Sequence, residues 1–262
     1  MGSSGPTSVL LTILNVVQVI LGFGITCVAL WFFVEVYNIT SLRNSNHYLL
    51  DYKLYWPQAI PWVFILAGLL VICVSGCGFV GAKKKSSGFV TLFIAFEVTA
   101  ILALIAAAIV ALTLADTNST AAFMKDAIWD VYTHMRSDRS VETAFGNFEK
   151  RFQCCGAEGP RDYKNWRDEF PISCCDTYYH GFIGSYAIDC DFSNKLANER
   201  YGCAKVVINY TSIIIKVLAG AAIFTAFIGI MNLVVGVTLS RSLKRKPRQV
   251  VQMESESKKV LL

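Results

Sequence analysis

The chain has 262 residues, of which 54% are hydrophobic and 16% are charged. Together with a mean hydropathy of +0.48, this balance excludes an ordinary soluble protein and indicates an integral membrane protein. The net charge of +5 says little as a sum, but the positions of the basic residues orient the chain in the membrane.

Four apolar runs stand out along the chain. Each is longer than the roughly 20 residues that cross a hydrocarbon core about 30 Å thick at ~1.5 Å per residue. The first run follows a tail, residues 1–9, that has no Lys or Arg, so we expect an anchor and not a cleaved signal peptide. We therefore predict an all-α membrane protein with four transmembrane helices, at residues 10–36, 59–81, 89–114 and 211–239.

Basic residues give the expected orientation. Three lysines lie in the short loop 82–88 between the second and third runs, and a second basic group lies in the tail 240–262. By the positive-inside rule both segments are cytoplasmic, and four crossings then place both termini in the cytoplasm. A small loop, residues 37–58, and a large loop, residues 115–210, are expected on the extracellular side.

The large loop is predicted to be mainly helical. Apolar residues at helical spacing indicate two amphipathic helices between residues 116 and 152, and a short helix at 203–210 leads into the fourth crossing. Their apolar faces contain Met124, Ile128, Val131 and Met135 in the first helix and Val141, Phe145, Phe148 and Phe152 in the second. Residues 156–202, between the second amphipathic helix and the short helix at 203–210, lose this periodicity, which predicts an irregular segment. The polar tail 240–262 is expected to be disordered.

The cysteines divide sharply by place. Cys27, Cys73 and Cys77 lie within apolar runs. The other six lie in the large loop: Cys154, Cys155, Cys174, Cys175, Cys190 and Cys203. Six cysteines in one extracellular segment predict three disulfides, whereas a zinc site is disfavoured because no histidine stands at ligand spacing. Spacing does not choose among the 15 pairings that six cysteines allow.

Short motifs around these cysteines identify a family. The sequence reads Cys-Cys-Gly at 154–156, Pro-Ile-Ser-Cys-Cys at 171–175 and Gly-Cys at 202–203, just before the last crossing. This set closely resembles the signature of tetraspanins, and the resemblance extends to the four crossings, the loop sizes and the lysine-rich inner loop. It implies disulfides between Cys154 and Cys203, Cys155 and Cys174, and Cys175 and Cys190, each contributing about 2 to 4 kcal/mol.

The resemblance also implies chemistry within the membrane. It suggests S-palmitoylation of Cys77 and, with less support because it lies deeper, of Cys73; the competing interpretation is that both are ordinary small apolar residues. It implies a sterol-sized cavity between the four helices and a closed-to-open swing of the large loop. Asn232 stands in the fourth crossing, where the family usually has Glu or Gln. No other cofactor and no metal is expected.

Polar residues inside the crossings need partners. Asn15, Glu97 and Asn232 lie at roughly one depth, so they could form one interhelical hydrogen-bonded cluster. Alternatively, Glu97 is protonated and buried by itself, and Asn15 reaches water. Small residues also recur every seven positions in the first two crossings, which would let these helices approach closely; they are Asn15, Gly22 and Ala29, then Pro61, Gly68, Ser75 and Ala82.

The expected outer surface carries two kinds of candidate site. Asn38, Asn118 and Asn209 begin N-glycosylation sequons, all on the extracellular side. Aromatic residues of the cysteine-rich segment are candidates for binding partners, since such side chains anchor interfaces. We assign partner contacts to Tyr178, Tyr179, Phe182 and Tyr186, and we place Tyr163 and Trp166 in the loop core.

Three kinds of function compete. An enzyme is disfavoured because His47, His134 and His180 are scattered and no metal, phosphate or nucleophile motif appears. A four-helix channel or transporter is the alternative, but few ionisable residues lie inside the crossings. We favour a tetraspanin-like organiser that binds other integral membrane proteins, including other tetraspanins, and membrane lipids, in the plasma membrane and endosomal membranes. No nucleic acid is expected as a partner.

Overall fold

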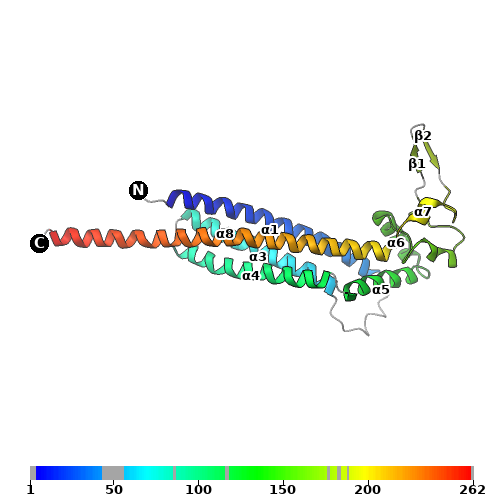
Figure 1. Cartoon of the computed structure of the whole chain (residues 1–262), viewed down its shortest axis with the longest axis horizontal. Coiled ribbons are helices and arrows are strands. Elements are labelled where there is room, and N and C mark those ends of the chain that lie inside the picture. Colours follow the sequence, from blue (N-terminus) through cyan, green and yellow to red (C-terminus); the bar gives the residue numbers. More distant parts are fainter. Residues whose placement is uncertain are drawn as a thin grey trace. The chain divides into compact units, whose positions relative to one another are not determined.

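A computed structural model of the chain is dominated by helices (Figure 1). It describes residues 4–42, 56–84, 87–115, 118–175, 178–181, 184–187 and 189–260. The chain divides into two compact units. The first, which we call the bundle, contains Met1–Phe32, Ile60–Leu112 and Val217–Leu262. The second, which we call the loop unit, contains Phe33–Ala59 and Thr113–Lys216.

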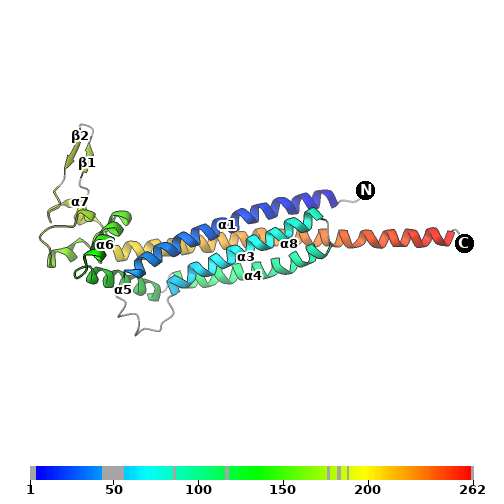
Figure 2. The same cartoon turned by 180° about the vertical axis from the view of Figure 1, so that it is seen from behind.

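Four long helices supply the bundle. They are α1 (Ser4–Ser41), α3 (Trp56–Lys84), α4 (Ser87–Ala115) and α8 (Cys203–Val260). Their bundle portions run side by side in both views (Figures 1 and 2). Each helix contains a segment long and apolar enough to cross a membrane: Gly5–Ser41, Ala59–Lys84, Ser87–Ala115 and Cys203–Leu243. The predicted all-α class with four transmembrane helices is thereby confirmed.

The last helix is longer than predicted. A short helix, a crossing and a disordered tail were expected after residue 203, but α8 is one continuous helix from Cys203 to Val260. The prediction of a disordered tail is therefore wrong for residues 240–260, which are helical. Lys, Arg, Glu, Gln and Met favour a helix that has already been nucleated, and α8 continues past Pro247 although proline removes one backbone donor there.

The bundle carries large apolar side chains on its outside as well as in its core. Each of its helices presents a large apolar side chain that is more than half exposed: Ile20, Leu66, Leu102 and Phe227. Such a surface suits a hydrocarbon solvent, where exposing these groups costs nothing. In the interior, aliphatic and aromatic residues from all four helices form a core that includes Leu11, Val74, Phe93 and Leu239.

Two glycines bring α1 and α3 into close contact. A Cβ atom added at Gly68 would lie 2.9 Å from the carbonyl oxygen of Gly22 and would also clash with the Thr26 hydroxyl. Both positions belong to the small-residue seam that the seven-residue spacing predicts. Close backbone approach of this kind stabilises helix pairs in membranes, where the hydrophobic effect does not hold helices together.

The loop unit is built on two helices, α5 (Asn118–His134) and α6 (Arg139–Phe152), as predicted. The α6 helix begins where Asp138 Oδ1 accepts a hydrogen bond of 2.8 Å from the Ser140 backbone amide. It ends at Gln153, whose φ of 52° is left-handed and closes the last turn. The double cysteine motif follows at once, so the end of α6 positions it.

Residues 156–202 are more regular than the sequence indicates. Three short helices lie in this segment, η1 (Pro160–Asn165), η2 (Ile172–Cys174) and α7 (Lys195–Glu199). A two-stranded antiparallel hairpin, β1 (Tyr178–Gly181) and β2 (Gly184–Ala187), is added to the predicted all-α fold. Such short elements carry too few residues for a helical or strand period to be recognised in the sequence.

An aromatic cluster forms the centre of the loop unit. The fully buried ring of Tyr132 makes edge-to-face contacts with Trp129, Phe145, Tyr163 and Trp166. Its hydroxyl also accepts a hydrogen bond of 2.8 Å from the Trp166 indole. The prediction that Tyr163 belongs to the core is confirmed, whereas Trp166 joins the cluster but is only partly buried. The helix η1, which carries Tyr163, is thereby fixed against α5 and α6.

Candidate functional site

Three disulfides fasten the cysteine-rich segment to the helices of the loop unit. They join Cys154 to Cys203, Cys155 to Cys174, and Cys175 to Cys190. These are the same three pairs that the tetraspanin resemblance implies. Because each double cysteine sends its two bonds to different segments, the end of α6, the helix η2 and the start of α8 are tied together at one place.

Backbone hydrogen bonds reinforce the same junction. The amide of Cys155 donates to Tyr201 O, and the amide of Cys203 donates to Gly156 O, both at 3.0 Å. Gly156 adopts a φ of 68°, and a Cβ there would clash with the carbonyl oxygen of Gly159. Only glycine adopts this conformation without strain, which explains the glycine of the Cys-Cys-Gly motif. A Cβ at Gly202 would likewise overlap the backbone of Glu158.

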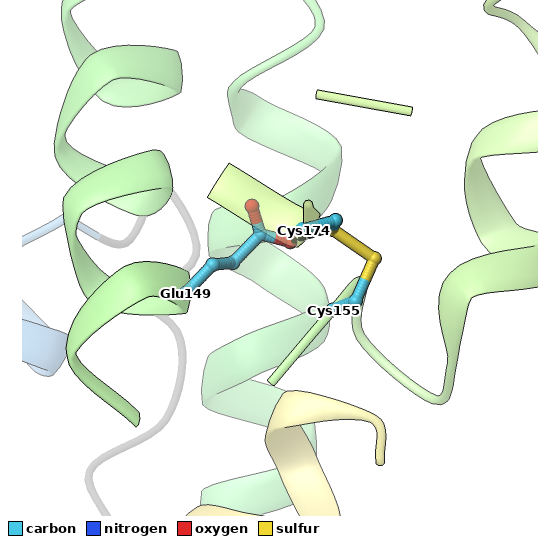
Figure 3. Close-up of side chains that lie close together, drawn as sticks. All are labelled: Glu149, Cys155 and Cys174. Carbon is cyan, nitrogen blue, oxygen red and sulfur yellow. Dashed lines mark hydrogen bonds between the residues drawn. A yellow bond between two sulfur atoms is a disulfide. The ribbon is translucent and has the colours of Figure 1, made fainter. Parts of the chain in front are cut away.

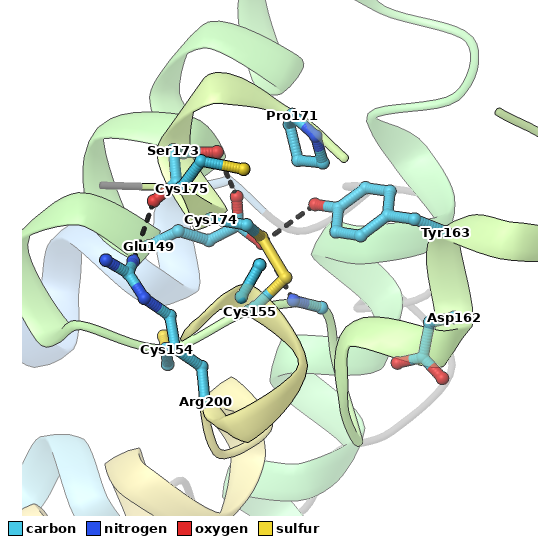
Figure 4. The surroundings of a disulfide bond; sticks show 12 residues. Glu149, Cys154, Cys155, Asp162, Tyr163, Pro171, Ser173, Cys174, Cys175 and Arg200 are labelled. Carbon is cyan, nitrogen blue, oxygen red and sulfur yellow. Dashed lines mark hydrogen bonds between the residues drawn. A yellow bond between two sulfur atoms is a disulfide. The ribbon is translucent and has the colours of Figure 1, made fainter. Parts of the chain in front are cut away.

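A buried carboxylate, Glu149, lies at the centre of this junction (Figure 4). Its Oε1 accepts hydrogen bonds of 2.8 Å from the Gly156 amide and from the Tyr163 hydroxyl, and its Oε2 accepts one of 2.5 Å from the Ser173 hydroxyl. Arg200 donates to the Ser173 carbonyl oxygen at 2.9 Å. Glu149 therefore joins α6, the Cys-Cys-Gly turn, η1 and η2.

Burial changes the protonation chemistry of this centre. It raises the pKa of the Glu149 carboxyl above the ordinary 4.5, although the hydrogen bonds from Ser173, Gly156 and Tyr163 oppose the rise. Burial, together with the neighbouring carboxylate, raises the pKa of the Tyr163 hydroxyl far above its usual range. Tyr163 is consequently a hydrogen-bond donor to Glu149 at any physiological pH.

The same carboxylate lies beside a disulfide, and the two do not form a metal site. Glu149, Cys155 and Cys174 offer ligand-type atoms within 4.8 Å of one another (Figure 3). Zinc binding requires thiolates, whereas both sulfurs here are bonded to each other. The disulfide interpretation of the cysteines therefore holds at this place.

Sequence reasoning did not identify Glu149, although a signal was present. Glu149 follows Val141 and Phe145 at four-residue intervals, and all three are buried on one face of α6. The predicted apolar stripe passed instead through Phe148 and Phe152, which are only partly buried. An acidic residue in register with a buried helix face indicates a satisfied internal carboxylate.

An ion pair that sequence reasoning also missed holds the outer end of α1 within the loop unit. Arg151 of α6 donates to the carboxylate of Glu35, which is buried although Arg151 itself is half exposed. Beside this pair, the Phe152 ring packs edge-to-face on Tyr210 of α8 at 5.3 Å. The end of α6 is thus connected to both α1 and α8.

The predicted partner-binding aromatic residues gather at the hairpin. Tyr178 and Tyr179 lie on β1 and Tyr186 on β2, and the register places Tyr179 opposite Tyr186. Phe182 lies outside the described residues. The structure brings three of the four positions to one small element, and their role in partner binding stays a prediction.

The polar residues of the bundle form a hydrogen-bonded chain through a residue that was not predicted. Gln18 donates from Nε2 to Glu97 Oε1 at 2.7 Å, and Asn232 donates to Gln18 Oε1. The chain connects α1, α4 and α8. Asn15 is not part of it, because its amide donates to the Leu11 carbonyl oxygen of its own helix at 2.8 Å. Among the described residues, Asn15 Oδ1, Glu97 Oε2 and Asn232 Oδ1 are buried without a hydrogen-bond partner.

The candidate modification sites lie at exposed positions. Asn38, Asn118 and Asn209 are exposed, on α1, α5 and α8 respectively. Cys73 is exposed and Cys77 is partly exposed on α3. Exposure is necessary for glycan transfer or acylation, and the modifications themselves stay predictions.

Comparison with known proteins adds to this geometry. The protein-family model described as "Tetraspanin family" matches residues 7–242. The 23 kDa integral membrane protein of Schistosoma mansoni is 30% identical over 134 residues, which cover 49% of this chain and 57% of that protein. The CD63 antigen of Bos taurus is 25% identical over 191 residues, 71% of this chain and 76% of that protein. The 23 kDa integral membrane protein of Schistosoma japonicum is 29% identical to this chain, and the alignment covers 50% of that protein. The chain thus spans only about half the length of the two Schistosoma proteins.

Proposed function

The chain belongs to the tetraspanin family, and on this premise we propose that it is a membrane organiser. In this role it binds other integral membrane proteins side by side and gathers them, together with other tetraspanins and lipids, into assemblies. We assign it to the plasma membrane and endosomal membranes, where such assemblies would influence adhesion, signalling or trafficking.

One observation carries the proposal: a rigid frame that holds an outward-facing segment. Hydrogen bonds to Glu149 and the Cys155–Cys174 disulfide fasten residues 156–202 to the end of α6, and the Cys154–Cys203 disulfide joins that end to α8. The contacts of Tyr132 with Tyr163 and Trp166 fasten the segment to α5. The segment nonetheless exposes Ile172, Leu196 and Tyr201, each a large apolar or aromatic side chain. A preorganised surface of this kind binds partners without a large cost in conformational entropy.

The contacts of the bundle support lateral association through the helices as well. Its outward apolar side chains offer surfaces that pack equally well against lipid and against another helix. We infer no enzymatic role, because the described histidines lie apart on α5 and β1, and His134 contacts a backbone oxygen, that of Leu42.

The experiment exchanges residues 176–189 with the corresponding segment of another tetraspanin. Partners are then captured by proximity labelling in living cells. We expect partner capture to be lost while the surface level and the three disulfides are unchanged, because the exchanged segment lies between fastening points.

The reciprocal chimera is the matched control. Residues 176–189 placed in the other tetraspanin should transfer capture of the same partners to that protein. If capture by this chain is unaffected by the exchange, the contacts lie elsewhere, and if neither chimera captures anything, partner choice requires the helices.

A further inference from the structure

The hairpin of the loop unit has two outer edges. In both views β1 and β2 extend away from the helices of this unit (Figures 1 and 2). The two strands pair with each other, and among the described residues no third strand joins their sheet. Each outer edge therefore presents backbone amides and carbonyl groups outside the pairing of the sheet. Such a row of groups is a template on which a further strand can pair.

The register of the hairpin identifies the groups that point outward. The pair closest to the turn is Gly181 and Gly184, with two residues between them. A connection this short requires these two residues to bond to each other, and bonded and non-bonded pairs alternate along antiparallel strands. His180 and Ser185 therefore lie opposite each other without bonding, so the amide and carbonyl of each point to an outer edge. On β2 the same holds for Ala187.

The sequence of the hairpin leaves these edges unprotected. Natural edge strands are commonly blocked by lysine, by proline or by other charged side chains. Residues 177–188 contain no Lys, Arg, Asp, Glu or Pro, and several of them are aromatic. An edge of this composition favours pairing with another strand, which is how peptide-binding domains of several kinds capture extended segments.

The charges beside β2 indicate which strand would pair. Asp189 follows the end of β2 by two residues and, together with Asp191 and Lys195, lines a shallow pocket of about 310 Å³. Because two carboxylates face one ammonium group, this end of β2 attracts a basic side chain. A second copy of the hairpin supplies none, since residues 176–194 contain three Asp and no Lys or Arg. The occupant is therefore a strand of a different protein.

We propose that the outer edge of β2 binds an uncharged extended strand from the extracellular domain of another membrane protein, with Lys or Arg at the end beside Asp189. The backbone of Ser185 and Ala187 exchanges hydrogen bonds with that strand, and the Asp189 carboxylate pairs with its basic residue. This inference rests on the proposed function, because it specifies how the hairpin recognises the partners assigned to it. Backbone pairing tolerates different side chains, so one edge can serve several partners.

The test measures binding of a synthetic strand to the purified full-length protein in detergent. The probe is a fluorescent peptide of alternating Val and Thr with a lysine at each end, and the control peptide has glutamate at each end. Ser185→Pro removes the outward amide and should weaken binding about fivefold to tenfold, because one backbone hydrogen bond is lost and a peptide carbonyl is left unpaired. Ser185→Ala should bind as the wild type does. Asp189→Asn should weaken binding about twofold.

His180→Pro is the matched control. His180 lies opposite Ser185, and its amide points to the edge of β1, so this variant should bind the probe as the wild type does. Peptide mapping under non-reducing conditions should show the Cys175–Cys190 disulfide in every variant. Unchanged binding by Ser185→Pro, equal losses in the two proline variants or equal binding of the two peptides overturns the proposal. A dimer of the full-length protein that Ser185→Pro dissociates would assign the edge to a second copy instead.

Capture of partners in cells separates this inference from the proposed function. Capture that is lost in the exchange of residues 176–189 but retained in Ser185→Pro would keep the hairpin as the partner site and exclude strand pairing. Capture that survives the exchange overturns the partner site itself. Loss of capture in Ser185→Pro, with retention in Ser185→Ala and in His180→Pro, supports both.

Discussion

The bundle and the loop unit each bury a glutamate completely, but they hold it in opposite ways. Glu149 of the loop unit accepts from three donors on three different segments, whereas Glu97 of the bundle accepts from Gln18 alone and keeps one oxygen without a partner. A buried acceptor without a donor costs about 1 to 3 kcal/mol. The loop unit is therefore held by a polar centre whose hydrogen bonds are all made, whereas the bundle is held by close helix packing around a polar centre with few hydrogen bonds.

Removing the saturated centre should have the largest effect. Glu149→Leu leaves the Gly156 amide and the Tyr163 and Ser173 hydroxyls without their acceptor, and we expect the free energy of unfolding to fall by about 4 kcal/mol. Chemical unfolding of the purified protein, followed by near-ultraviolet circular dichroism, measures the change. Glu169→Leu, at an exposed carboxylate of the same loop unit, should have a much smaller effect. If both variants lose the same unfolding free energy, the three hydrogen bonds to Glu149 do not stabilise the loop unit more than an exposed carboxylate does.

Filling the close contact of the bundle should have the next largest effect. Gly68→Val forces α1 and α3 apart at the Gly22 carbonyl and should cost about 1 to 3 kcal/mol. Gly76→Val is the matched control, since Gly76 lies on the same helix with open space around it. Thermal aggregation in detergent and surface expression measure both variants. Tolerance of valine at Gly68 would mean that close packing does not define the bundle.

Interrupting the sparse centre should have a smaller effect. Gln18→Leu removes the link between Glu97 and Asn232, and interhelical hydrogen bonds in membranes contribute about 0.6 kcal/mol on average. A double-mutant cycle with Asn232→Leu should show coupling of about that size. Thr99→Val, which removes a hydroxyl bonded only within its own helix, should show no coupling to Asn232. A coupling energy of several kcal/mol between Gln18 and Asn232 would show that the polar centre of the bundle contributes as much to stability as Glu149 does in the loop unit.

The pH dependence of Glu149 should be the most subtle effect. Because the folded-state pKa is raised above the unfolded value near 4.5, the folded protein binds the proton more tightly. This contribution to stability is complete below pH 4.5 and is lost as pH rises through the raised pKa, at a rate of at most about 1.4 kcal/mol per pH unit. The difference in unfolding free energy between the wild type and Glu149→Gln should therefore shift against the wild type as pH rises. A difference that is constant from pH 4 to 8 would show that the pKa is not raised.

The sequence predicts what depends on pattern over many residues. The four apolar runs and the two amphipathic helices could be predicted because composition and helical spacing determine them. Tyr163 could be placed in the core because it lies close to the Cys-Cys-Gly turn. The hairpin and the three short helices could not, since their form depends on where the disulfides hold the chain.

The buried polar partners escaped prediction for a different reason. Depth along the membrane suggested Asn15 as the partner of Glu97, but its short side chain donates to the Leu11 carbonyl oxygen, and the longer Gln18 crosses to α4. Glu35 at the end of an apolar run is explained only by Arg151, which is 116 positions away in the chain. Partners this distant become visible only when the fold is known.

The order of the cysteines along the chain has a consequence for biosynthesis. Cys203 is the first residue of α8 and forms its disulfide with Cys154, 49 positions earlier. At a synthesis rate of ~5–20 residues per second, Cys154 waits roughly 2 to 10 s for its partner after entering the lumen. During that time Cys174, Cys175 and Cys190 arrive, so Cys155 and Cys175 meet their partners first. The bond that closes the domain can form only when the last membrane helix begins to emerge. A disulfide between Cys154 and any cysteine made before Cys203 is therefore non-native, and thiol–disulfide exchange must rearrange it before the domain can close.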